Sequence, residues 1–270
     1  MYREPSRLAV ESWAFSNACS VASRVVFPSR GCCADLRDRF GVADSKIVAI
    51  ANPINCARVR RLSWAPLAPE DMAAIRDVPS YVHVGRLDPS KNHDLLIQAC
   101  LVLRAQGRDF MVWCVGEGAE RPRLAAEIAS WGLERHIVLL GVRQNPYPLI
   151  RHAAALILTS NFEAFGLVLA EGMACGVPVI STNCVAGPPE VLQNGESGLL
   201  VPVDDAVALA SAMERIVADG PLRQRLIAAG HARVEDFDIS RIARQWEAMI
   251  DAVLLLPKPA EALSGEAALP

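Results

Sequence analysis

The segment that decides the fold is Ala153–Gly176, with the sequence AAALILTSNFEAFGLVLAEGMACG. Its apolar run, Ala153–Leu158, predicts a buried strand, and the residues from Phe165 onward predict a helix. Glu163 falls in the polar turn between them, and Glu171 falls in the second turn of the helix. Open α/β sheets bind ligands, particularly anionic ones, where a buried strand leads into a helix N-terminus. Two carboxylates at such a place suit a ligand rich in hydroxyl groups and phosphate.

The same alternation of short apolar runs and helical patterns begins near Pro79 and continues beyond this segment. The predicted strands are Tyr81–Val84, Phe110–Val115, Ile137–Leu140, Ala155–Leu158, Val177–Ser181 and Leu199–Val201. The predicted helices between them are His93–Gln106, Arg121–Trp131, Pro146–His152, Phe165–Cys175 and Pro188–Leu192. Strands that are apolar on both faces, each followed by a helix, indicate a parallel sheet that is covered on both sides. The sequence therefore predicts one α/β domain over residues 56–238, a Rossmann-like sheet with helices on both faces.

Residues 1–55 contain too few strands for an independent domain. The pattern predicts a helix within residues 6–20, and then strand Arg24–Phe27, helix Gly31–Phe40 and strand Lys46–Ala49. Asn52–Asn55 reads as a linker, because proline restricts itself and the residue before it. We expect residues 1–55 to be the end of a second Rossmann-like domain together with this linker.

Three helices are predicted after the sheet, at Asp204–Ala218, Leu222–Val234 and Ile239–Leu255. The last of these forms a separate C-terminal helix, assigned to residues 239–256. The final residues, 257–270, are rich in proline and alanine and predict a disordered tail.

Composition limits the classes of function. The chain has 52% hydrophobic and 21% charged residues, which is typical of a globular protein with a large core. A formal net charge of −3 gives no overall basic field, so nucleic acid is not an expected partner. Only Lys46, Lys91 and Lys258 are lysines among the 27 basic residues, which makes Lys91 more informative than an arginine at the same place.

The eight cysteines are scattered and form no Cys-x-x-Cys pair, which argues against a zinc site and a disulfide framework. The N-terminus lacks the apolar core of a signal peptide, and no segment is long enough to span a bilayer. We therefore expect a protein of the reducing cytoplasm, peripheral at most to the inner face of a membrane.

The loop after the first strand of the large domain, Val84–Asn92, contains Gly85, Arg86 and Lys91. Glycine permits a tight exit from the strand, and two cations five residues apart can converge on a pair of phosphates. The alternative is a solvated loop that carries two unrelated charges.

Three other segments that follow strands are open to two interpretations. Gly116-Glu117-Gly118 is either a ligand-binding turn or a structural one, and Gly141-Val142-Arg143 is equally ambiguous. Gly187-Pro188 near a helix start can place backbone N–H groups beside an anion, or it can simply begin the helix. Glu163 can favour the following helix dipole instead of a ligand, and Glu171 can be a buried acid that needs a hydrogen-bond partner.

Taken in order, these segments resemble the donor-binding half of family 4 glycosyltransferases, which are retaining enzymes of the GT-B fold. The resemblance rests on Gly85-Arg86-Leu87…Lys91, Gly116-Glu117-Gly118, Glu163-x-Phe165-Gly166…Glu171, Gly187-Pro188-x-Glu190, Asn52–Asn55, Asn145-Pro146-Tyr147 and Gly195-x-x-Gly198-Leu199-Leu200-Val201-Pro202. It extends over nearly the whole chain, to about residue 255.

The resemblance implies a role for each of these residues. Arg86 and Lys91 hold the diphosphate of a nucleotide sugar and stabilise the departing nucleoside diphosphate, with no metal and no cofactor. Glu163 binds hydroxyl groups of the transferred sugar and completes the catalytic set, and Glu171 binds the ribose. The turn at residues 116–118 and the backbone at residues 142–143 contact the base. The backbone at Phe165, Gly166 and Leu167 lies near the sugar and the phosphate. Together with Glu171, the full set of donor-binding positions is Gly85, Gly116, Glu117, Val142, Arg143, Phe165, Gly166, Leu167 and Gly187.

The chain departs from the family pattern in three places. Ala164 stands where the family usually has glycine, and Asn183 replaces an acid. More important, family members have a complete N-terminal acceptor domain, whose glycine-rich loop and histidine have no counterpart among residues 1–55.

Three functional hypotheses follow. The first is a retaining glycosyltransferase that moves a sugar from a nucleotide diphosphate, preferably UDP, to a glycan or lipid-linked acceptor of cell-envelope or exopolysaccharide synthesis. The second is a nucleotide-sugar-binding module without activity, either a gene remnant or half of a split enzyme completed by a partner chain. The third is an epimerase or a phosphorylase of the GT-B fold.

Overall fold

A computed structural model describes residues 15–256 of the chain. A helix is present over residues 15–21, and the rest of the helix predicted within residues 6–20 lies outside the described part. The predicted disordered tail, 257–270, also lies outside it. All the other predicted helices and strands can be compared with the structure.

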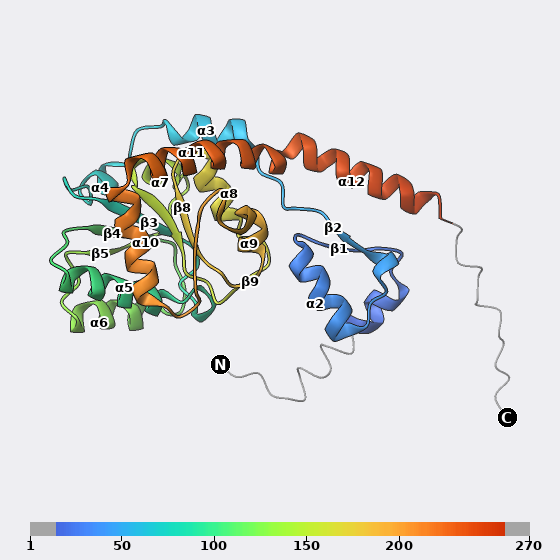
Figure 1. Cartoon of the computed structure of the whole chain (residues 1–270), viewed down its shortest axis with the longest axis horizontal. Coiled ribbons are helices and arrows are strands. Elements are labelled where there is room, and N and C mark those ends of the chain that lie inside the picture. Colours follow the sequence, from blue (N-terminus) through green and yellow to red (C-terminus); the bar gives the residue numbers. More distant parts are fainter. Residues whose placement is uncertain (1–14, 257–270) are drawn as a thin grey trace, which may run out of the picture.

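The main element is a six-stranded parallel sheet with the strand order β10-β8-β6-β3-β4-β5. Its strands are β3 (Ser80–Val84), β4 (Met111–Val115), β5 (Ile137–Gly141), β6 (Ala155–Leu158), β8 (Val179–Thr182) and β10 (Leu199–Val201). Each predicted strand is present, with its ends within two residues of the prediction. Figure 1 shows the sheet between two layers of helices.

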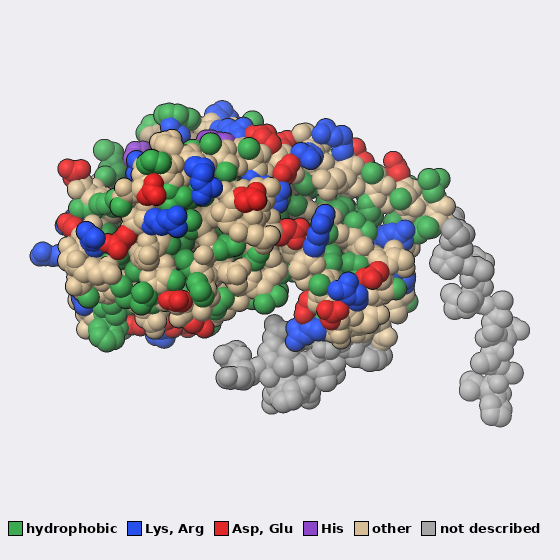
Figure 2. All heavy atoms as spheres, viewed as in Figure 1, with side chains coloured by type: hydrophobic (Ala, Val, Ile, Leu, Met, Phe, Trp, Pro, Cys, Tyr) green, Lys and Arg blue, Asp and Glu red, His purple; other side chains and the backbone are tan. Residues whose placement is uncertain are grey.

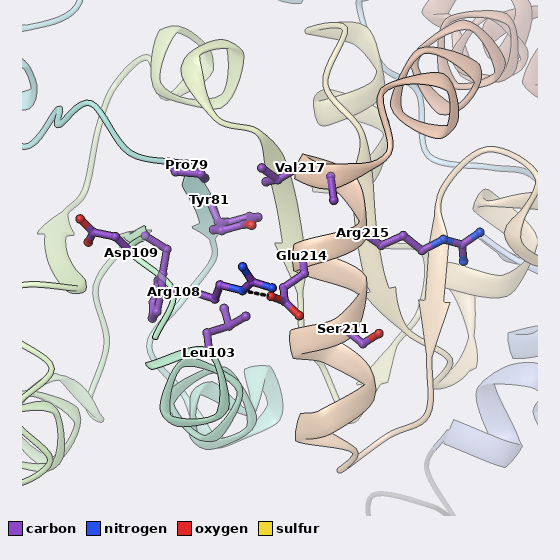
Figure 3. A pocket seen from close by; sticks show the side chains of 11 residues that line it. Pro79, Tyr81, Leu103, Arg108, Asp109, Ser211, Glu214, Arg215 and Val217 are labelled. Carbon is purple, nitrogen blue, oxygen red and sulfur yellow. Dashed lines mark hydrogen bonds and ion pairs between the residues drawn. The ribbon is translucent and has the colours of Figure 1, made fainter. Parts of the chain in front are cut away.

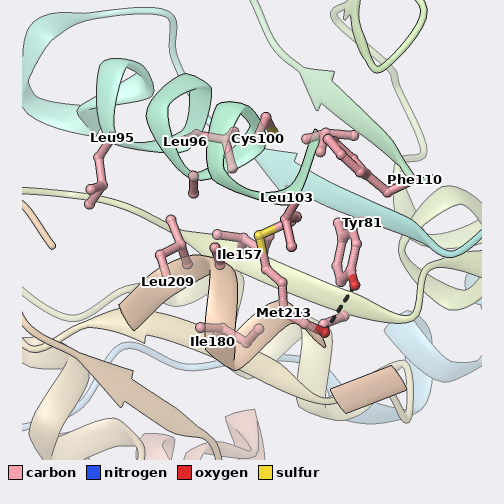
Figure 4. Close-up of a cluster of buried hydrophobic side chains, with 14 of the residues drawn as sticks. Tyr81, Leu95, Leu96, Cys100, Leu103, Phe110, Ile157, Ile180, Leu209 and Met213 are labelled. Atoms are coloured by element: carbon pink, nitrogen blue, oxygen red, sulfur yellow. Dashed lines mark hydrogen bonds between the residues drawn. The ribbon is translucent and has the colours of Figure 1, made fainter. Parts of the chain in front are cut away.

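Alternate residues of each strand face opposite helical layers. Cys114 of β4 packs into a core with α5 (His93–Ala105), α6 (Arg121–Ser130) and α10 (Ala206–Ala218). Figure 4 shows this core, in which the Tyr81 hydroxyl donates to the Met213 carbonyl oxygen at 2.9 Å. The neighbouring Trp113 faces the other core, built by helices on the opposite side of the sheet. These helices are α3 (Cys56–Ser63), α7 (Tyr147–His152), α8 (Leu167–Ala174) and α9 (Gly187–Val191).

Two short helices in the large domain were not predicted. They are α3 and α4 (Pro69–Met72). The Asn55 side chain caps α3 by accepting from the Arg58 backbone N–H at 2.8 Å, and Cys56 and Val59 are buried on one side of the helix. A two-stranded parallel pair, β7 (Phe162–Glu163) with β9 (Val185–Ala186), was also not predicted.

Residues 25–49 form a smaller unit, in which β1 (Val25–Phe27) pairs in parallel with β2 (Ile47–Ala49). The connection between them is α2 (Arg30–Phe40), followed by the single turn η1 (Asp44–Lys46). The Ser29 side chain caps α2, and Gly41 ends it with a φ of +63°. The strands and helix predicted here are therefore present.

The linker between the two units, near Ile54, contacts the segment that follows the large domain, near Ile239. After α11 (Gly220–Val234) and the turn η4 (Glu235–Phe237), the Ile239 backbone N–H donates to the Ile54 carbonyl oxygen at 2.9 Å. α12 (Ile239–Leu254) starts there and extends away from the sheet, toward the side on which β1 and β2 lie (Figure 1). It ends two residues before the predicted limit of 256. Figure 2 shows acidic and basic side chains interspersed over the visible face of the molecule.

Candidate functional site

The order of the strands reverses at β3. The chain runs from β3 through β4 to β5 on one side, and then crosses to β6, β8 and β10 on the other side. The carboxyl ends of β3 and β6 therefore flank the crevice in which open α/β sheets bind ligands. The loops that leave these two strands contain residues 85–92 and 159–166, which are the segments that the sequence analysis singled out.

Lys91 and Glu163 meet at this crevice. Lys91 Nζ lies 2.5 Å from Glu163 Oε2, and the two side chains are only 18% and 19% exposed. The Ser160 hydroxyl donates to the same carboxylate oxygen at 3.3 Å. The structure thus brings together two of the three predicted catalytic residues, as a half-buried pair of opposite charges.

Arg86, the third predicted catalytic residue, points into solvent. Its side chain is 79% exposed, and its guanidinium lies 3.0 Å from the carboxylate of Asp88. Burial raises the pKa of Asp88, but hydrogen bonds from Ser90 and the charge of Arg86 outweigh this effect and lower it. Asp88 therefore stays ionised and holds Arg86 beside the crevice rather than in contact with Lys91 or Glu163.

The loop that carries Lys91 is tied to the loop after β6. Asn92 has a left-handed backbone, with a φ of +48°, and its side-chain amide donates to Asn161 Oδ1 at 2.7 Å and to Asp204 Oδ1 at 2.9 Å. The Asn161 backbone N–H donates to the Ser90 carbonyl oxygen at 3.0 Å. These contacts fix the turn η2 (Pro89–Lys91) relative to the strand end that leads to Glu163.

The glycines after β4 allow two strand-end loops to pack against each other. A Cβ atom at Gly116, which has a φ of +143°, would lie 1.9 Å from the carbonyl oxygen of Gly85. A Cβ atom at Gly118 would lie 2.1 Å from the carbonyl oxygen of Leu87. Glu117 between them pairs with Arg121 at 2.8 Å. This geometry gives the Gly-x-Gly turn a structural purpose, and it leaves the predicted base contact a prediction.

Glu171 has the hydrogen-bond partner that the sequence analysis required. The Tyr147 hydroxyl donates to Glu171 Oε1 at 3.0 Å. Burial raises the pKa of Glu171, and the hydrogen bond from Tyr147 partly offsets this rise. The pKa of Tyr147 is raised by its own burial and by the Glu171 charge. The pair joins α7 to α8 at the side of the crevice.

Backbone atoms, rather than side chains, form the start of α8. Gly166 caps the helix with a φ of +84°. Phe165 is buried against Phe237, with ring centroids 5.1 Å apart, whereas Leu167 is partly exposed. Gly187 is needed because a Cβ atom there would lie 2.4 Å from Phe165 Cα. This close approach brings the two helix starts, α8 and α9, side by side.

The segment after β5 is held by a buried ion pair. Arg143 Nε and Nη2 each lie 2.7 Å from Asp71 Oδ1, and the Asp71 side chain is only 5% exposed. Arg143 also donates to the Leu140 carbonyl oxygen at 2.5 Å. A cavity of about 360 Å³ lies between this segment and residues 66–71, which include the start of α4. The guanidinium is therefore fully engaged, and Arg143 offers its backbone to a ligand beside the exposed Val142.

The family model described as glycosyl transferases group 1 matches residues 71–233, which is more than half of the chain and contains all of these site segments. The chain belongs to this family.

Individual relatives support the assignment. The chain is 31% identical, over 80% of its length, to a Campylobacter jejuni protein named N-acetylgalactosamine-N,N'-diacetylbacillosaminyl-diphospho-undecaprenol 4-alpha-N-acetylgalactosaminyltransferase. It is 33% identical, over 67% of its length, to the Rhizobium meliloti lipopolysaccharide core biosynthesis glycosyltransferase LpsE. The matches cover 56% and 50% of those two proteins, so the chain spans about half the length of these relatives.

Solved structures confirm the predicted fold class. Anabaena HepE in complex with UDP and glucose superposes with a TM-score of 0.78 at 22% identity, over 90% of this chain and 67% of HepE. Sucrose-phosphate synthase from Thermosynechococcus elongatus superposes with a TM-score of 0.76 at 29% identity, over 93% of this chain and 62% of the synthase. The chain therefore shares its fold, a Rossmann-like sheet with helices on both faces, with these two solved structures.

The smaller unit touches the large domain beside the crevice. The Arg30 backbone N–H, at the start of α2, donates to Glu190 Oε2 at 2.7 Å. A Cβ atom at Gly31 would lie 2.6 Å from Ala186 Cα, so the two backbones are in close contact. Ala186 itself has a φ of +85°, which is unusual for a residue with a side chain.

A second cavity, of about 390 Å³, lies at the opposite end of the sheet (Figure 3). Tyr81 and Leu103 line it, and an ion pair between Arg108 and Glu214 lies across it. Because it is near the amino ends of β3 and β4, it is separate from the crevice.

No helix within residues 15–256 has both the length and the hydropathy of a membrane span.

Proposed function

We propose that the chain binds a nucleotide-diphosphate sugar, preferably a UDP-sugar, and transfers the sugar with retention of configuration. The acceptor is a glycan or a lipid-linked precursor of cell-envelope or exopolysaccharide synthesis. The observation that carries the proposal is the Lys91–Glu163 pair at the point where the strand order reverses, in a chain of the group 1 glycosyltransferase family. The diphospho-undecaprenol and lipopolysaccharide relatives support the choice of acceptor.

Donor binding exchanges one set of partners for another. In the free protein the Lys91 ammonium and the Glu163 carboxylate neutralise each other. A diphosphate takes the ammonium group as a partner, and sugar hydroxyl groups donate to the carboxylate, which can only accept. The exposed Arg86 guanidinium can move from Asp88 onto the same diphosphate.

The transfer step needs stabilisation of the leaving group. The bond between the anomeric carbon and the phosphate oxygen breaks, a bond to the acceptor hydroxyl oxygen forms, and the proton of that hydroxyl passes to the departing phosphate. Negative charge grows on the nucleoside diphosphate. Lys91 offsets it from its place at the crevice, and Arg86 offsets it after moving from Asp88 onto the diphosphate. No step in this proposal uses a metal. The ribose binds Glu171, and the base binds the backbone near Val142 and Arg143.

Isothermal titration with UDP and with UDP-sugars tests this proposal. We expect Lys91→Ala, Glu163→Gln and Glu171→Ala each to weaken binding of the UDP-sugar by about tenfold or more. Glu214→Gln is the matched control, because Glu214 also forms an ion pair but lies at the opposite end of the sheet. Absence of binding by the unmodified chain, or equal affinities in all the variants, contradicts the proposal.

A second candidate function is donor binding without turnover. The chain spans about half the length of its relatives, and its smaller unit has two strands in the described residues. In this case a partner chain supplies the acceptor-binding surface, and the protein works in the cytoplasm at the inner membrane face. Sugar transfer or donor hydrolysis by the purified chain alone excludes this candidate.

A further inference from the structure

A chain of buried hydrogen bonds lies behind the Lys91–Glu163 pair. The Thr159 hydroxyl donates to the main-chain carbonyl oxygen of Lys91 at 2.7 Å. On its other side, Thr159 Oγ1 lies 3.4 Å from His83 Nε2. His83 and Thr159 have no exposed surface. These contacts connect β3, the end of β6 and the turn η2, which are the three elements that form the crevice.

The direction of these hydrogen bonds follows from the chemistry of the groups. A threonine hydroxyl has one proton, and the short contact to Lys91 uses it. The hydroxyl oxygen can therefore only accept from His83, which requires the proton of a neutral His83 ring to be on Nε2. His83 Nδ1 is then the bare ring nitrogen. Within residues 15–256, it is one of two buried side-chain atoms that have no hydrogen-bond partner, and the other is His93 Nε2. The resulting order is His83 N–H to Thr159 O–H to Lys91 C=O.

The Lys91 main chain needs such an anchor. Lys91 ends a single helical turn, and Asn92 then takes a left-handed conformation before α5 begins. The Lys91 side chain is a flexible four-carbon stem, so the place of its ammonium group depends on how firmly its backbone is held. His93 packs against the His83 ring, with ring centroids 4.5 Å apart, and supports it from the first turn of α5.

We infer that His83 is a positioning residue, which acts through Thr159 to fix the Lys91 main chain and hence the meeting point of Lys91 with Glu163. It does not touch the donor. The inference rests on the proposed function only for its consequence, which is that the ammonium group is held where the diphosphate binds. The anchoring of the loop can be measured in the protein without a ligand.

The first test compares Thr159→Val with Thr159→Ser in the full chain. Valine keeps the shape of threonine without the hydroxyl, and serine keeps the hydroxyl. Hydrogen exchange of a peptide spanning residues 86–95 should be about tenfold faster in the valine variant, because the Lys91 carbonyl oxygen loses its buried donor. The serine variant should exchange like the unmodified protein. Equal exchange in the valine variant and the unmodified protein overturns the inference.

The second test compares His83→Phe with His83→Gln. Phenylalanine fills the ring site without a donor, whereas the glutamine amide places an N–H close to the position of Nε2. The glutamine variant should restore slow exchange and UDP affinity, and the phenylalanine variant should lose both by about tenfold. A ¹⁵N spectrum of the unmodified protein should show the His83 signals of a protonated Nε2 and a bare Nδ1. A protonated Nδ1, or identical exchange in both variants, overturns the inference.

The readouts separate the inference from the proposed function. If the unmodified chain does not bind UDP, the proposed function fails, and the exchange of residues 86–95 still decides the anchoring of Lys91. If UDP binds equally well in Thr159→Val and exchange is unchanged, the function stands and the inference fails. Should His83→Phe not fold, the two Thr159 variants decide alone.

Discussion

Lys91 Nζ and Glu163 Oε2 lie 2.5 Å apart although 72 positions separate the two residues in the chain. The loops after β3 and β6 bring them together, because these strands are neighbours in the sheet but not in the sequence. Each charge is therefore placed by a different strand end, and each can be removed without deleting the loop that carries the other.

Removing the ammonium group should affect catalysis far more than folding. We expect Lys91→Met to lower the rate of sugar transfer or donor hydrolysis by about 100-fold or more, because it removes a fixed cation from the leaving phosphate. The melting temperature should fall only modestly, because the Ser160 hydroxyl still donates to the Glu163 carboxylate and methionine keeps the apolar stem of lysine. A radiolabelled UDP-sugar assay measures the rate. Lys46→Met, in the smaller unit, is the control, and an equal loss of rate in that variant contradicts the assignment.

The Arg143–Asp71 pair should contribute to stability. Asp71→Asn leaves the guanidinium in a largely buried place without its anionic partner, so we expect a loss of about 3 kcal/mol in the free energy of unfolding. Urea denaturation measures this value. Arg37 and Asp44 form an exposed pair at 3.4 Å, and Asp44→Asn should leave the free energy of unfolding nearly unchanged. Similar losses of unfolding free energy in the two variants would show that the buried pair stabilises the fold no more than the exposed pair does.

Gly116 and Gly107 separate two reasons for a glycine. Both have a positive φ, but a Cβ atom at Gly116 meets a carbonyl oxygen, whereas a Cβ atom at Gly107 meets nothing within 4 Å. We expect Gly116→Ala to cost at least about 2 kcal/mol and Gly107→Ala to cost about 1 kcal/mol. Thermal unfolding of the two variants checks the difference. If Gly107→Ala is as unstable as Gly116→Ala, the contact between a Cβ atom at Gly116 and the carbonyl oxygen does not add to the cost, which would falsify this prediction.

The sheet could be predicted because its strands are buried on both faces. Such strands are continuous apolar runs, and glycine or proline marks their ends, as at Val84-Gly85 and Val115-Gly116. The placement of the loops that carry Lys91 and Glu163 at one edge of the sheet also follows from the sequence, since parallel strands place their carboxyl ends together. The short helix α3 could not be predicted in this way. It has three arginines among eight residues, and its helical form depends on the burial of Cys56 and Val59 by distant elements.

The contacts between side chains in the site could not be predicted from sequence patterns. The need of Glu171 for a hydrogen bond could be predicted, but not that Tyr147, 24 residues away, would supply it. Asp71 precedes the predicted sheet and carries no motif, so its pairing with Arg143 depends on the packing of α4 against the loop after β5. Local sequence sets the backbone of this site, and tertiary packing chooses the contacts between its side chains.

Ala186 should be a point of backbone strain. Its φ of +85° and ψ of −108° lie in a region that glycine occupies freely and alanine does not. We expect Ala186→Gly to raise the free energy of unfolding by about 1 kcal/mol. Ala243→Gly, at an exposed position within α12, should have the opposite effect of about 1 kcal/mol. Chemical denaturation of both variants tests this, and destabilisation by Ala186→Gly contradicts it.

Acid should destabilise the protein through His93. Burial lowers the pKa of this side chain to about 4, from about 6.5 in the unfolded chain. Between these values the unfolded state binds more protons than the folded state, so stability is complete above about pH 6.5 and falls as the pH drops to about 4. The difference corresponds to about 3 kcal/mol. His83, whose pKa is also lowered by burial, adds to the effect in the same direction.

Urea denaturation at a series of pH values measures how much of the free energy of unfolding is lost on acidification. This loss should be smaller in His93→Gln than in the unmodified protein. An identical loss in both proteins rules out the contribution of His93.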